Sequence, residues 1–262
     1  MGRFHRHDDG TVHTHDHSDP ENHGHEHHDH GDHSGYETGS QRIDVLESIF
    51  AENDVRADYN RKAFENNGIR APNLMSSPGS GKTTVLGATL DELAGEFAVG
   101  VIEGDIATDL DAAKLGGRGA QISLLNTGNG FGGECHLDAP MVNRALQGLD
   151  LPQLDLVIIE NVGNLVCPAE FDVGEHAKAM VYSVTEGDDK PLKYPVMFRA
   201  VDVVLLNKID LVPYLDVDVD SYMARVREVN PTATILPVSA RTGAGMSAWF
   251  GWLRRFMATA AT

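Results

Sequence analysis

Cysteine is scarce in this chain, which contains 2 cysteines among 262 residues. Two cysteines cannot build the disulfide framework of a small secreted protein, and they favour a compartment in which thiols stay reduced. The N-terminus lacks the apolar core of a signal peptide, and no apolar run is long enough to cross a bilayer. We therefore expect a cytoplasmic protein that is not inserted in a membrane.

Basic residues are also few: the chain has 21 Lys and Arg and 39 Asp and Glu. Its formal net charge is therefore −18 at pH 7. Such a charge argues against nonspecific binding to nucleic acid and against an anionic membrane surface as a partner. Hydrophobic residues make up 41% of the chain, which is enough for one sizeable core. The composition therefore predicts one folded domain with appendages.

Histidine, in contrast, is concentrated at the N-terminus, where 11 of the 13 histidines lie among Asp, Glu, Gly and Ser. With almost no apolar area to offset its ordering entropy, the segment 1–40 should be disordered. Imidazole is a borderline-soft ligand that suits Ni²⁺, Zn²⁺, Cu²⁺ or Co²⁺, and His-x-His spacing lets one ion collect several nitrogens. A merely solvating polar tail is the alternative. The predicted metal ligands of the tail are His5, His7, His13, His15, His17, His23, His25, His27, His28, His30 and His33.

The stretch SSPGSGKT at residues 76–83 has the form of a phosphate-binding loop. Backbone N–H groups would wrap the phosphates, Lys82 would reach the β- and γ-phosphoryl oxygens, and Thr83 would offer its hydroxyl to Mg²⁺. Ser76 replaces the usual first glycine and is small enough for a tight strand-to-helix turn; a Gly/Ser-rich linker is the alternative. The predicted phosphate contacts are Gly79, Ser80, Gly81, Lys82, Thr83 and Thr84.

The stretch NKID at residues 207–210 has the Asn-Lys-x-Asp form with which GTPases read guanine. Asp210 would accept hydrogen bonds from guanine N1–H and the exocyclic amine, an arrangement that adenine does not satisfy. Asn207 and Lys208 belong to the same motif, and a strand over residues 233–238 would deliver Ser239 and Ala240 to the same site. In this order, the two motifs predict a GTPase that uses GTP and Mg²⁺.

Apolar strands alternate with amphipathic helices behind the tail. This alternation predicts a parallel sheet covered by helices on both faces, with ligands bound outside the carboxyl ends of the strands. We therefore predict an α/β fold of the P-loop NTPase type, with a GTPase domain over residues 41–262 that begins with a helix. The expected strands are 71–75, 97–103, 122–125, 154–160, 200–206 and 233–238, and the expected helices are 41–67, 83–93, 139–149, 217–229 and 244–257.

Two carboxylates end predicted strands close to the phosphate loop. Asp105 and Glu160 would both approach Mg²⁺ and its waters, although an ordinary helix-capping carboxylate is the alternative for Asp105. Gly163 occupies the place of the Asp-x-x-Gly glycine of many GTPases, so that its N–H would sense the γ-phosphate. Lys82, Asp105 and Glu160 are thus the predicted catalytic residues. Because no arginine finger or water-orienting glutamine stands out, hydrolysis should be slow.

Both cysteines are candidate metal ligands. Cys135 is followed by His136, and Cys167 lies four residues after Gly163. Two thiolates and an imidazole form a soft ligand set, which is incomplete for tetrahedral zinc unless water or another chain contributes. Buried inert cysteines and a Cys135–Cys167 disulfide are the alternatives.

Together these segments resemble the HypB family of hydrogenase maturation GTPases. The matching stretches are 73–84 (NLMSSPGSGKTT), 103–105 (EGD), 126–128 (NTG), 135–139 (CHLDA), 160–168 (ENVGNLVCP) and 207–210 (NKID), within a likeness that covers roughly residues 43–258. The resemblance implies a SIMIBI-class domain that dimerises with GTP, and a nickel or zinc site from Cys135, His136 and Cys167 at the dimer interface. It also implies nickel storage by the tail and nickel insertion into the large-subunit precursor of [NiFe] hydrogenase, with a HypA-type nickel chaperone as a further partner.

The chain departs from the family pattern in two places. It has no cysteine before Cys135, where many relatives carry a cysteine-rich N-terminal nickel motif. Residues 131–134 (FGGE) look like an insertion before Cys135 and put the position of that thiolate in question. Two further functions stay open: a GTPase for another nickel enzyme such as urease, and a nickel storage protein with a vestigial GTPase.

Overall fold

The computed structural model describes residues 4–6, 12–14, 38–104, 115–125 and 136–259, and it describes side chains from residue 50 onward within these ranges. The chain divides into two compact units, Met1–Asp44 and Val45–Thr262. In the first unit, β1 (Phe4–Arg6) pairs antiparallel with β2 (Val12–Thr14), so that His5 lies opposite His13. A two-stranded ribbon is marginally stable in water, which agrees with a segment whose composition offers no core.

The second unit is built around a seven-stranded sheet with the strand order β5-β4-β6-β3-β7-β8-β9. Every neighbouring pair of strands in it is parallel. The carboxyl ends of the strands therefore lie along one edge of the sheet. The strands are β3 (Pro72–Ser76), β4 (Val99–Glu103), β5 (Gln121–Leu124), β6 (Leu156–Gly163), β7 (Ala177–Ser183), β8 (Val203–Asn207) and β9 (Thr234–Pro237).

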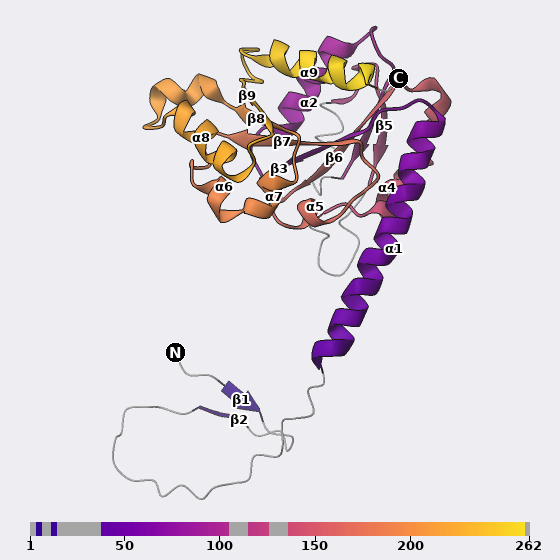
Figure 1. Cartoon of the computed structure of the whole chain (residues 1–262), viewed down its shortest axis with the longest axis vertical. Coiled ribbons are helices and arrows are strands. Elements are labelled where there is room, and N and C mark those ends of the chain that lie inside the picture. Colours follow the sequence, from indigo (N-terminus) through magenta and orange to yellow (C-terminus); the bar gives the residue numbers. More distant parts are fainter. Residues whose placement is uncertain (1–3, 7–11, 15–37, 105–114, 126–135, 260–262) are drawn as a thin grey trace, which may run out of the picture. The chain divides into compact units, whose positions relative to one another are not determined.

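Helices cover both faces of this sheet (Figure 1). The long helix α1 (Thr38–Asn66) precedes β3, and the elements that follow lie between or after the strands. They are α2 (Lys82–Leu93), α4 (Ala139–Leu146), η3 (Leu151–Gln153), α5 (Cys167–Glu170), α6 (Lys190–Lys193), α7 (Pro195–Arg199), η4 (Ile209–Tyr214), α8 (Val219–Val229) and α9 (Met246–Ala258).

Successive residues of the central strands belong to different parts of the core. In β6, Leu156 and Ile158 pack with α2 and α9, whereas Val157 and Ile159 pack with α1 and α4. This division follows from the strand repeat of two, because neighbouring side chains point to opposite faces. Strands that are buried on both faces consist of almost uninterrupted apolar residues, which is the pattern that the sequence displays.

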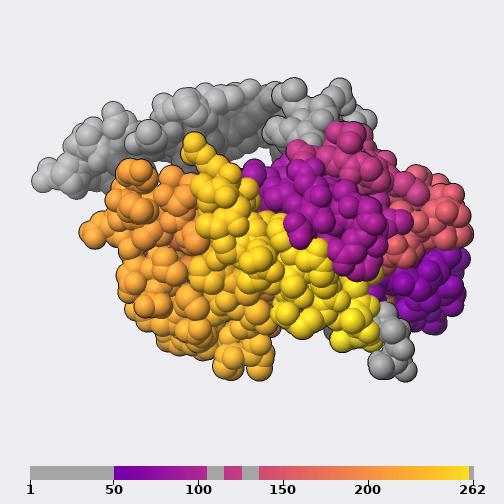
Figure 2. Space-filling model, turned by 90° about the horizontal axis from the view of Figure 1, so that it is seen from above, coloured from indigo at the N-terminus to yellow at the C-terminus, as the bar shows by residue number. Residues whose placement is uncertain are grey.

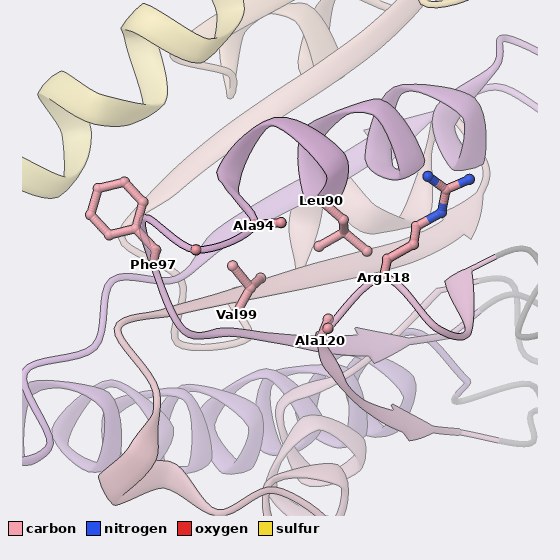
Figure 3. Close-up of a pocket in the computed structure, with 8 residues that line it drawn as sticks. Leu90, Ala94, Phe97, Val99, Arg118 and Ala120 are labelled. Carbon is pink, nitrogen blue, oxygen red and sulfur yellow. The ribbon is translucent and has the colours of Figure 1, made fainter.

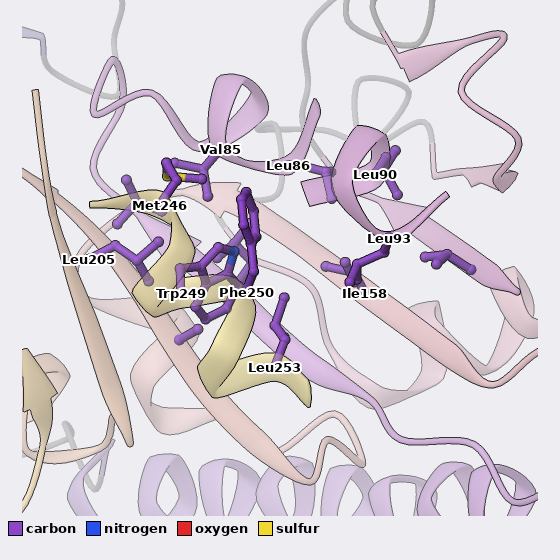
Figure 4. Packing of buried hydrophobic residues seen from close by; sticks show 14 of the residues in the cluster. Val85, Leu86, Leu90, Leu93, Ile158, Leu205, Met246, Trp249, Phe250 and Leu253 are labelled. Atoms are coloured by element: carbon purple, nitrogen blue, oxygen red, sulfur yellow. The ribbon is translucent and has the colours of Figure 1, made fainter. Parts of the chain in front are cut away.

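The face formed by α2 and α9 carries Trp249, the largest fully buried side chain among the described residues. Figure 4 shows Trp249, Phe250 and Leu253 of α9 against α2 and the strands. Trp249 is 2% exposed, and its indole N–H donates to Thr89 Oγ1 at 2.9 Å. The two helices also lie side by side on the surface in Figure 2. There the Arg254 guanidinium binds the carboxylates of α2 and of the turn that follows it.

The second half of α1 is attached to the domain through buried amides as well as apolar contacts. Asn53 Nδ2 donates to the Asp172 carbonyl at 2.8 Å. Asn60 Nδ2 donates to the carbonyls of Ala139 and Val173, at 2.9 and 3.1 Å. Phe64 of α1 is fully buried against α4 and the face of the sheet that carries Val157 and Ile159.

The predicted fold class is confirmed, and the expected helices and strands are present with shifts of a few residues at their ends. The helix expected over 41–67 is α1, which begins at Thr38. The strand expected over 154–160 continues to Gly163, so that the Glu160–Gly163 stretch ends a strand instead of forming a loop. The sequence interpretation missed β7, an interior strand between β3 and β8, and the short helices α5, α6 and α7.

Candidate functional site

The phosphate-loop candidate connects β3 to α2 and takes its shape from two glycines. Gly79 and Gly81 have φ of 74° and 99°, in the left-handed region that L-residues avoid. A Cβ on Gly81 would lie 2.6 Å from Asn207 Nδ2, so glycine is required there for space as well as for conformation. Ser76, by contrast, is a strand residue paired with Val181 of β7, and it does not have a positive φ. A glycine is therefore unnecessary at its position.

A buried ion pair lies directly beside this loop. Lys82 Nζ is 2.8 Å from Glu160 Oε1, and the two side chains are 5% and 0% exposed. Thr83 Oγ1 donates to the same carboxylate oxygen at 3.1 Å. Glu160 Oε2 is buried and accepts no hydrogen bond from any residue that the structure describes. Three of the residues predicted for phosphate and Mg²⁺ are thus brought together.

A second buried carboxylate stands next to Glu160. Glu103 ends β4 in register with Glu160, and it is 4% exposed. The sequence interpretation chose Asp105, two residues later, and missed Glu103. Asp105 lies outside the described residues. The signal for Glu103 was present, because a carboxylate at the end of an otherwise apolar strand is as unusual as the one at Glu160.

The base-recognition candidate is joined to the phosphate loop by its own side chains. Asn207 Nδ2 donates to the Ser80 carbonyl at 2.9 Å, and Lys208 Nζ donates to the Gly79 carbonyl at 2.6 Å. Lys208 has φ of 66° and is the one non-glycine residue with positive φ among those described. A strained backbone of this kind costs about 1–3 kcal/mol and persists where surrounding contacts hold it, often at functional sites.

Asp210 is oriented by the loop that follows β9. Ser239 Oγ donates to Asp210 Oδ1 at 2.6 Å, and the Ala240 N–H donates to Asn207 Oδ1 at 3.1 Å. Ser239 is fully buried, whereas Asp210 is half-buried. One carboxylate oxygen of Asp210 is therefore fixed from the protein side. The residues predicted for guanine all lie together.

A cavity of about 310 Å³ joins the two motifs. Its size and position suit a base stacked beside the phosphate loop. Its lining residues are Gly81, Thr84, Asn207, Lys208, Asp210, Leu211, Ala240 and Arg241, of which Leu211 and Arg241 were absent from the prediction. A smaller cavity of about 70 Å³ lies at the opposite end of α2, between Leu90, Phe97 and Arg118, and contains no predicted residue (Figure 3).

Gly163 lies against the phosphate loop at the end of β6. A Cβ on Gly163 would approach Pro78 Cα to 3.2 Å, so the two backbones are in close contact. Ser76 is paired with Gly163 across the two strands. The predicted place of Gly163 beside the phosphates is consistent with this geometry.

A polar cluster that the sequence interpretation missed holds the other side of the phosphate loop. The Ser77 hydroxyl donates to Glu186 Oε2, and Lys190 Nζ contacts both, at 3.0 Å from Ser77 Oγ and 2.7 Å from Glu186 Oε2. Burial raises the pKa of Tyr182, which therefore stays a hydrogen-bond donor to the Gly187 carbonyl within the same turn. Because β7 was missed, nothing in the sequence pattern indicated that this turn reaches the loop.

The candidate metal ligands are described only in part. His136 is half-buried, and its ring lies 4.1 Å from the ring of Phe171. Phe171 directly follows α5, the helix that Cys167 begins, so His136 is held beside that helix. Cys135 lies outside the described residues, as do all the tail histidines except His5 and His13. Within the described ranges no group of three or more His, Cys, Asp or Glu side chains forms a metal-binding cluster.

No helix in the described part of the chain is long and apolar enough to cross a membrane.

Comparison with known proteins identifies a family that matches the fold and the nucleotide-site motifs described above. Residues 71–237 match the family described as CobW/HypB/UreG, nucleotide-binding domain. The hydrogenase maturation factor HypB of Azotobacter chroococcum mcd 1 is 50% identical over 216 residues, which cover 82% of this chain and 70% of that protein.

Two solved structures are similar to most of the chain. The hydrogenase maturation factor HypB from Archaeoglobus fulgidus superposes with a TM-score of 0.73 at 37% identity, and covers 79% of this chain and 99% of its own. HypB from Helicobacter pylori in complex with nickel has a TM-score of 0.73 at 35% identity, with coverage of 79% and 96%.

Proposed function

The chain belongs to the HypB family of hydrogenase maturation factors, and from this premise we propose that it is a GTP-hydrolysing nickel metallochaperone. It stores nickel and helps to insert it into the large subunit of a [NiFe] hydrogenase in the cytoplasm. The observation that supports this most strongly is the cavity that joins the phosphate loop to Asp210, whose carboxylate is already oriented by Ser239.

Guanine selection follows from the charge and orientation of Asp210. Its carboxylate accepts hydrogen bonds and donates none, so it pairs with the N1–H and the exocyclic amine of guanine. Adenine presents an unprotonated N1 at that place and would leave the carboxylate unpaired, which is costly in a half-buried site. Asn207 and Lys208 support the selection by holding the phosphate loop against the base site.

Magnesium fits the oxygen donors beside the phosphate loop. Thr83 Oγ1 and the orphaned Glu160 Oε2 are hard ligands of the kind that Mg²⁺ prefers. When bound with nucleotide, the ion neutralises charge that develops on the phosphates. Lys82 exchanges Glu160 for the β- and γ-phosphates, and Glu160, with Asp105, orients water near the γ-phosphate. The Gly163 N–H contacts that phosphate from the end of β6.

Nickel is the cargo. Cys135, His136 and Cys167 offer the soft sulfur and nitrogen donors that suit Ni²⁺ or Zn²⁺, and the histidines of the tail hold further nickel. The structure determined for the Helicobacter pylori relative in complex with nickel supports this reading. The proposed assembly is a GTP-dependent homodimer with this metal site at its interface, and Val166, the exposed apolar residue directly before Cys167, supports it. A HypA-type chaperone and the large-subunit precursor are the proposed heterologous partners.

Complementation tests this function against simple storage. A host that lacks its own HypB-family protein is supplied with the wild-type chain, Lys82→Ala or the exposed-lysine control Lys62→Ala, and [NiFe] hydrogenase activity is measured at limiting nickel. Lys82→Ala should abolish GTP hydrolysis and hydrogenase activity, while Lys62→Ala should retain both. Full hydrogenase activity with Lys82→Ala would instead indicate a storage protein with a vestigial GTPase, and restoration of urease alone would indicate the other nickel enzyme.

A further inference from the structure

Asn161 follows Glu160 near the end of β6 and points to the opposite face of the sheet. Along β6, Ile158 faces α2 and α9, whereas Ile159 faces α1 and α4. Because side chains alternate along a strand, Glu160 lies on the α2 face and Asn161 on the α1 and α4 face. One peptide bond therefore joins a residue at the phosphate loop to a residue at the other side of the sheet.

The Asn161 side chain is fully buried and connects β6 to the candidate metal-ligand segment. Its Oδ1 accepts hydrogen bonds from the N–H groups of Leu137 at 3.0 Å and Val162 at 2.9 Å. Its Nδ2 donates to Asn73 Oδ1 at 3.3 Å. Leu137 is the residue directly after His136. The backbone at His136 is thus tied to the residue next to Glu160.

The same amide chain continues toward the support of the His136 ring. Asn73 Nδ2 donates to Glu175 Oε1 at 3.4 Å, and Glu175 Oε2 accepts from the Val173 N–H at 2.8 Å. Val173 lies two residues after Phe171, whose ring is in tilted contact with the His136 ring. The backbone next to His136 is therefore connected to Asn161 by a direct hydrogen bond, and the ring is connected to it through Phe171, the backbone up to Val173 and the buried hydrogen bonds that follow.

In the proposed function, nucleotide binding changes the contacts of Glu160, the residue directly before Asn161. Lys82, which now contacts Glu160 Oε1 at 2.8 Å, is the residue that reaches for the phosphates in the proposed function. Glu160 then exchanges its partner, and any shift of its backbone is passed to Asn161 through the peptide bond. We propose that Asn161 is the positioning residue that couples the nucleotide state at the phosphate loop to the position of His136, and hence to nickel affinity. This inference rests on the proposed nickel site.

The coupling is measurable in the full-length protein by a signal that the tail does not give. The two cysteines are Cys135 and Cys167, so a thiolate-to-nickel charge-transfer absorption band reports this site alone. Ni²⁺ is titrated into the protein with GDP and with a non-hydrolysable GTP analogue. The tail competes equally in both titrations, and the ratio of the two apparent affinities gives the coupling, which should be about fivefold or more in the wild-type protein.

Asn161→Ala removes the link, and Asn230→Ala is the matched control. Asn230 is also buried and makes comparable bonds, to the carbonyls of Phe198 and Val201 at 2.8 and 2.9 Å, but it has no contact with β6 or His136. In Asn161→Ala the nucleotide-dependent ratio should fall below about twofold while GDP affinity stays unchanged, whereas Asn230→Ala should keep the wild-type ratio.

A wild-type ratio retained in Asn161→Ala would overturn the inference and leave the proposed function intact. Absence of the charge-transfer band from the wild-type protein would overturn the nickel site itself, and the inference with it. Hydrogen exchange of the Leu137 amide in the wild-type protein tests the link without any substitution. Its protection should differ between the GDP and GTP-analogue states, and equal protection would contradict the proposed coupling.

Discussion

The buried pair of Lys82 and Glu160 allows a prediction about stability that is independent of catalysis. The two side chains are 5% and 0% exposed and 2.8 Å apart, so the Glu160 carboxylate depends on the Lys82 ammonium in place of water. Removing the Lys82 ammonium leaves the Glu160 carboxylate buried without its cation, and breaking a buried pair in this way costs about 3–5 kcal/mol. Thr83 donates to the same carboxylate oxygen and compensates a little, so Lys82→Met should lie at the lower end of this range.

A double variant in which both Lys82 and Glu160 are replaced distinguishes the cost of an unpaired buried charge from the cost of altered packing. In Lys82→Met with Glu160→Gln neither charge of the pair remains, and replacement of a whole ion pair is often close to neutral. The loss in the double variant should therefore be clearly smaller than the sum of the two single losses. The difference defines a coupling energy, which we expect near the upper end of the range of about 0.5–3 kcal/mol found for contacting residues.

Thermal unfolding of the four proteins without nucleotide or Mg²⁺ gives these quantities directly. For a domain of this size about 1 kcal/mol corresponds to about 2–4 °C in Tm, so Lys82→Met should lose about 6–20 °C. Strictly additive losses, or a Lys82→Met variant as stable as the wild-type protein, would show that the two side chains do not form a buried pair and would refute the argument.

Three further predictions concern other parts of the chain. Deleting residues 1–37, which precede α1, should remove most of the bound Ni²⁺ equivalents and leave GTP turnover unchanged. Equilibrium dialysis measures the bound nickel, and an undiminished amount would exclude the tail as the nickel store. Burial lowers the pKa of His176, whose neutral Nδ1 accepts the backbone N–H of Ala71 at 3.1 Å. Below about pH 6.5 the unfolded chain therefore binds a proton that the folded protein does not, so the free energy of unfolding should fall as the pH drops further. His176→Gln should show a weaker decrease in a pH series of denaturant titrations, and an equal decrease would assign the effect to other groups. Gly81→Ala places a Cβ against Asn207 and should abolish GTP binding. The control Gly95→Ala has a similarly positive φ of 81° but open space around its Cβ, so it should only lower Tm. Equal effects of the two variants on GTP binding would contradict the steric argument.

The motifs at the carboxyl ends of the strands were predictable because each is a local pattern. The phosphate loop and the base motif need only a strand before them, and strands buried on both faces consist of apolar runs that are visible in the sequence. Once the strands are parallel, their ends meet at one edge, and residues as distant as Lys82 and Glu160 come together. The fold class and the base site followed from this reasoning.

The residues that connect these motifs were not predictable in the same way. Asn161 and Asn73 are polar, and polarity alone predicts exposure, whereas their burial depends on hydrogen bonds to segments that are distant in sequence. The register between β3 and β6 determines those bonds, and no local pattern specifies it. β7 was missed because its apolar stretch carries Lys178 and follows the polar residues at 174–176, which reduced the contrast on which the strand assignment depends.

The affinity for GTP relative to ATP tests the central claim most directly. Two hydrogen bonds from guanine to the Asp210 carboxylate, at about 1.5–3 kcal/mol each, predict that GTP binds about 10²–10⁴-fold more tightly than ATP. Isothermal titration calorimetry with the non-hydrolysable analogues of both nucleotides, in the presence of Mg²⁺, measures the ratio. Asp210→Asn should lower GTP affinity and favour xanthosine triphosphate, because the amide donates to the carbonyl that replaces the exocyclic amine. Equal affinities for the GTP and ATP analogues in the unmodified protein would contradict the account.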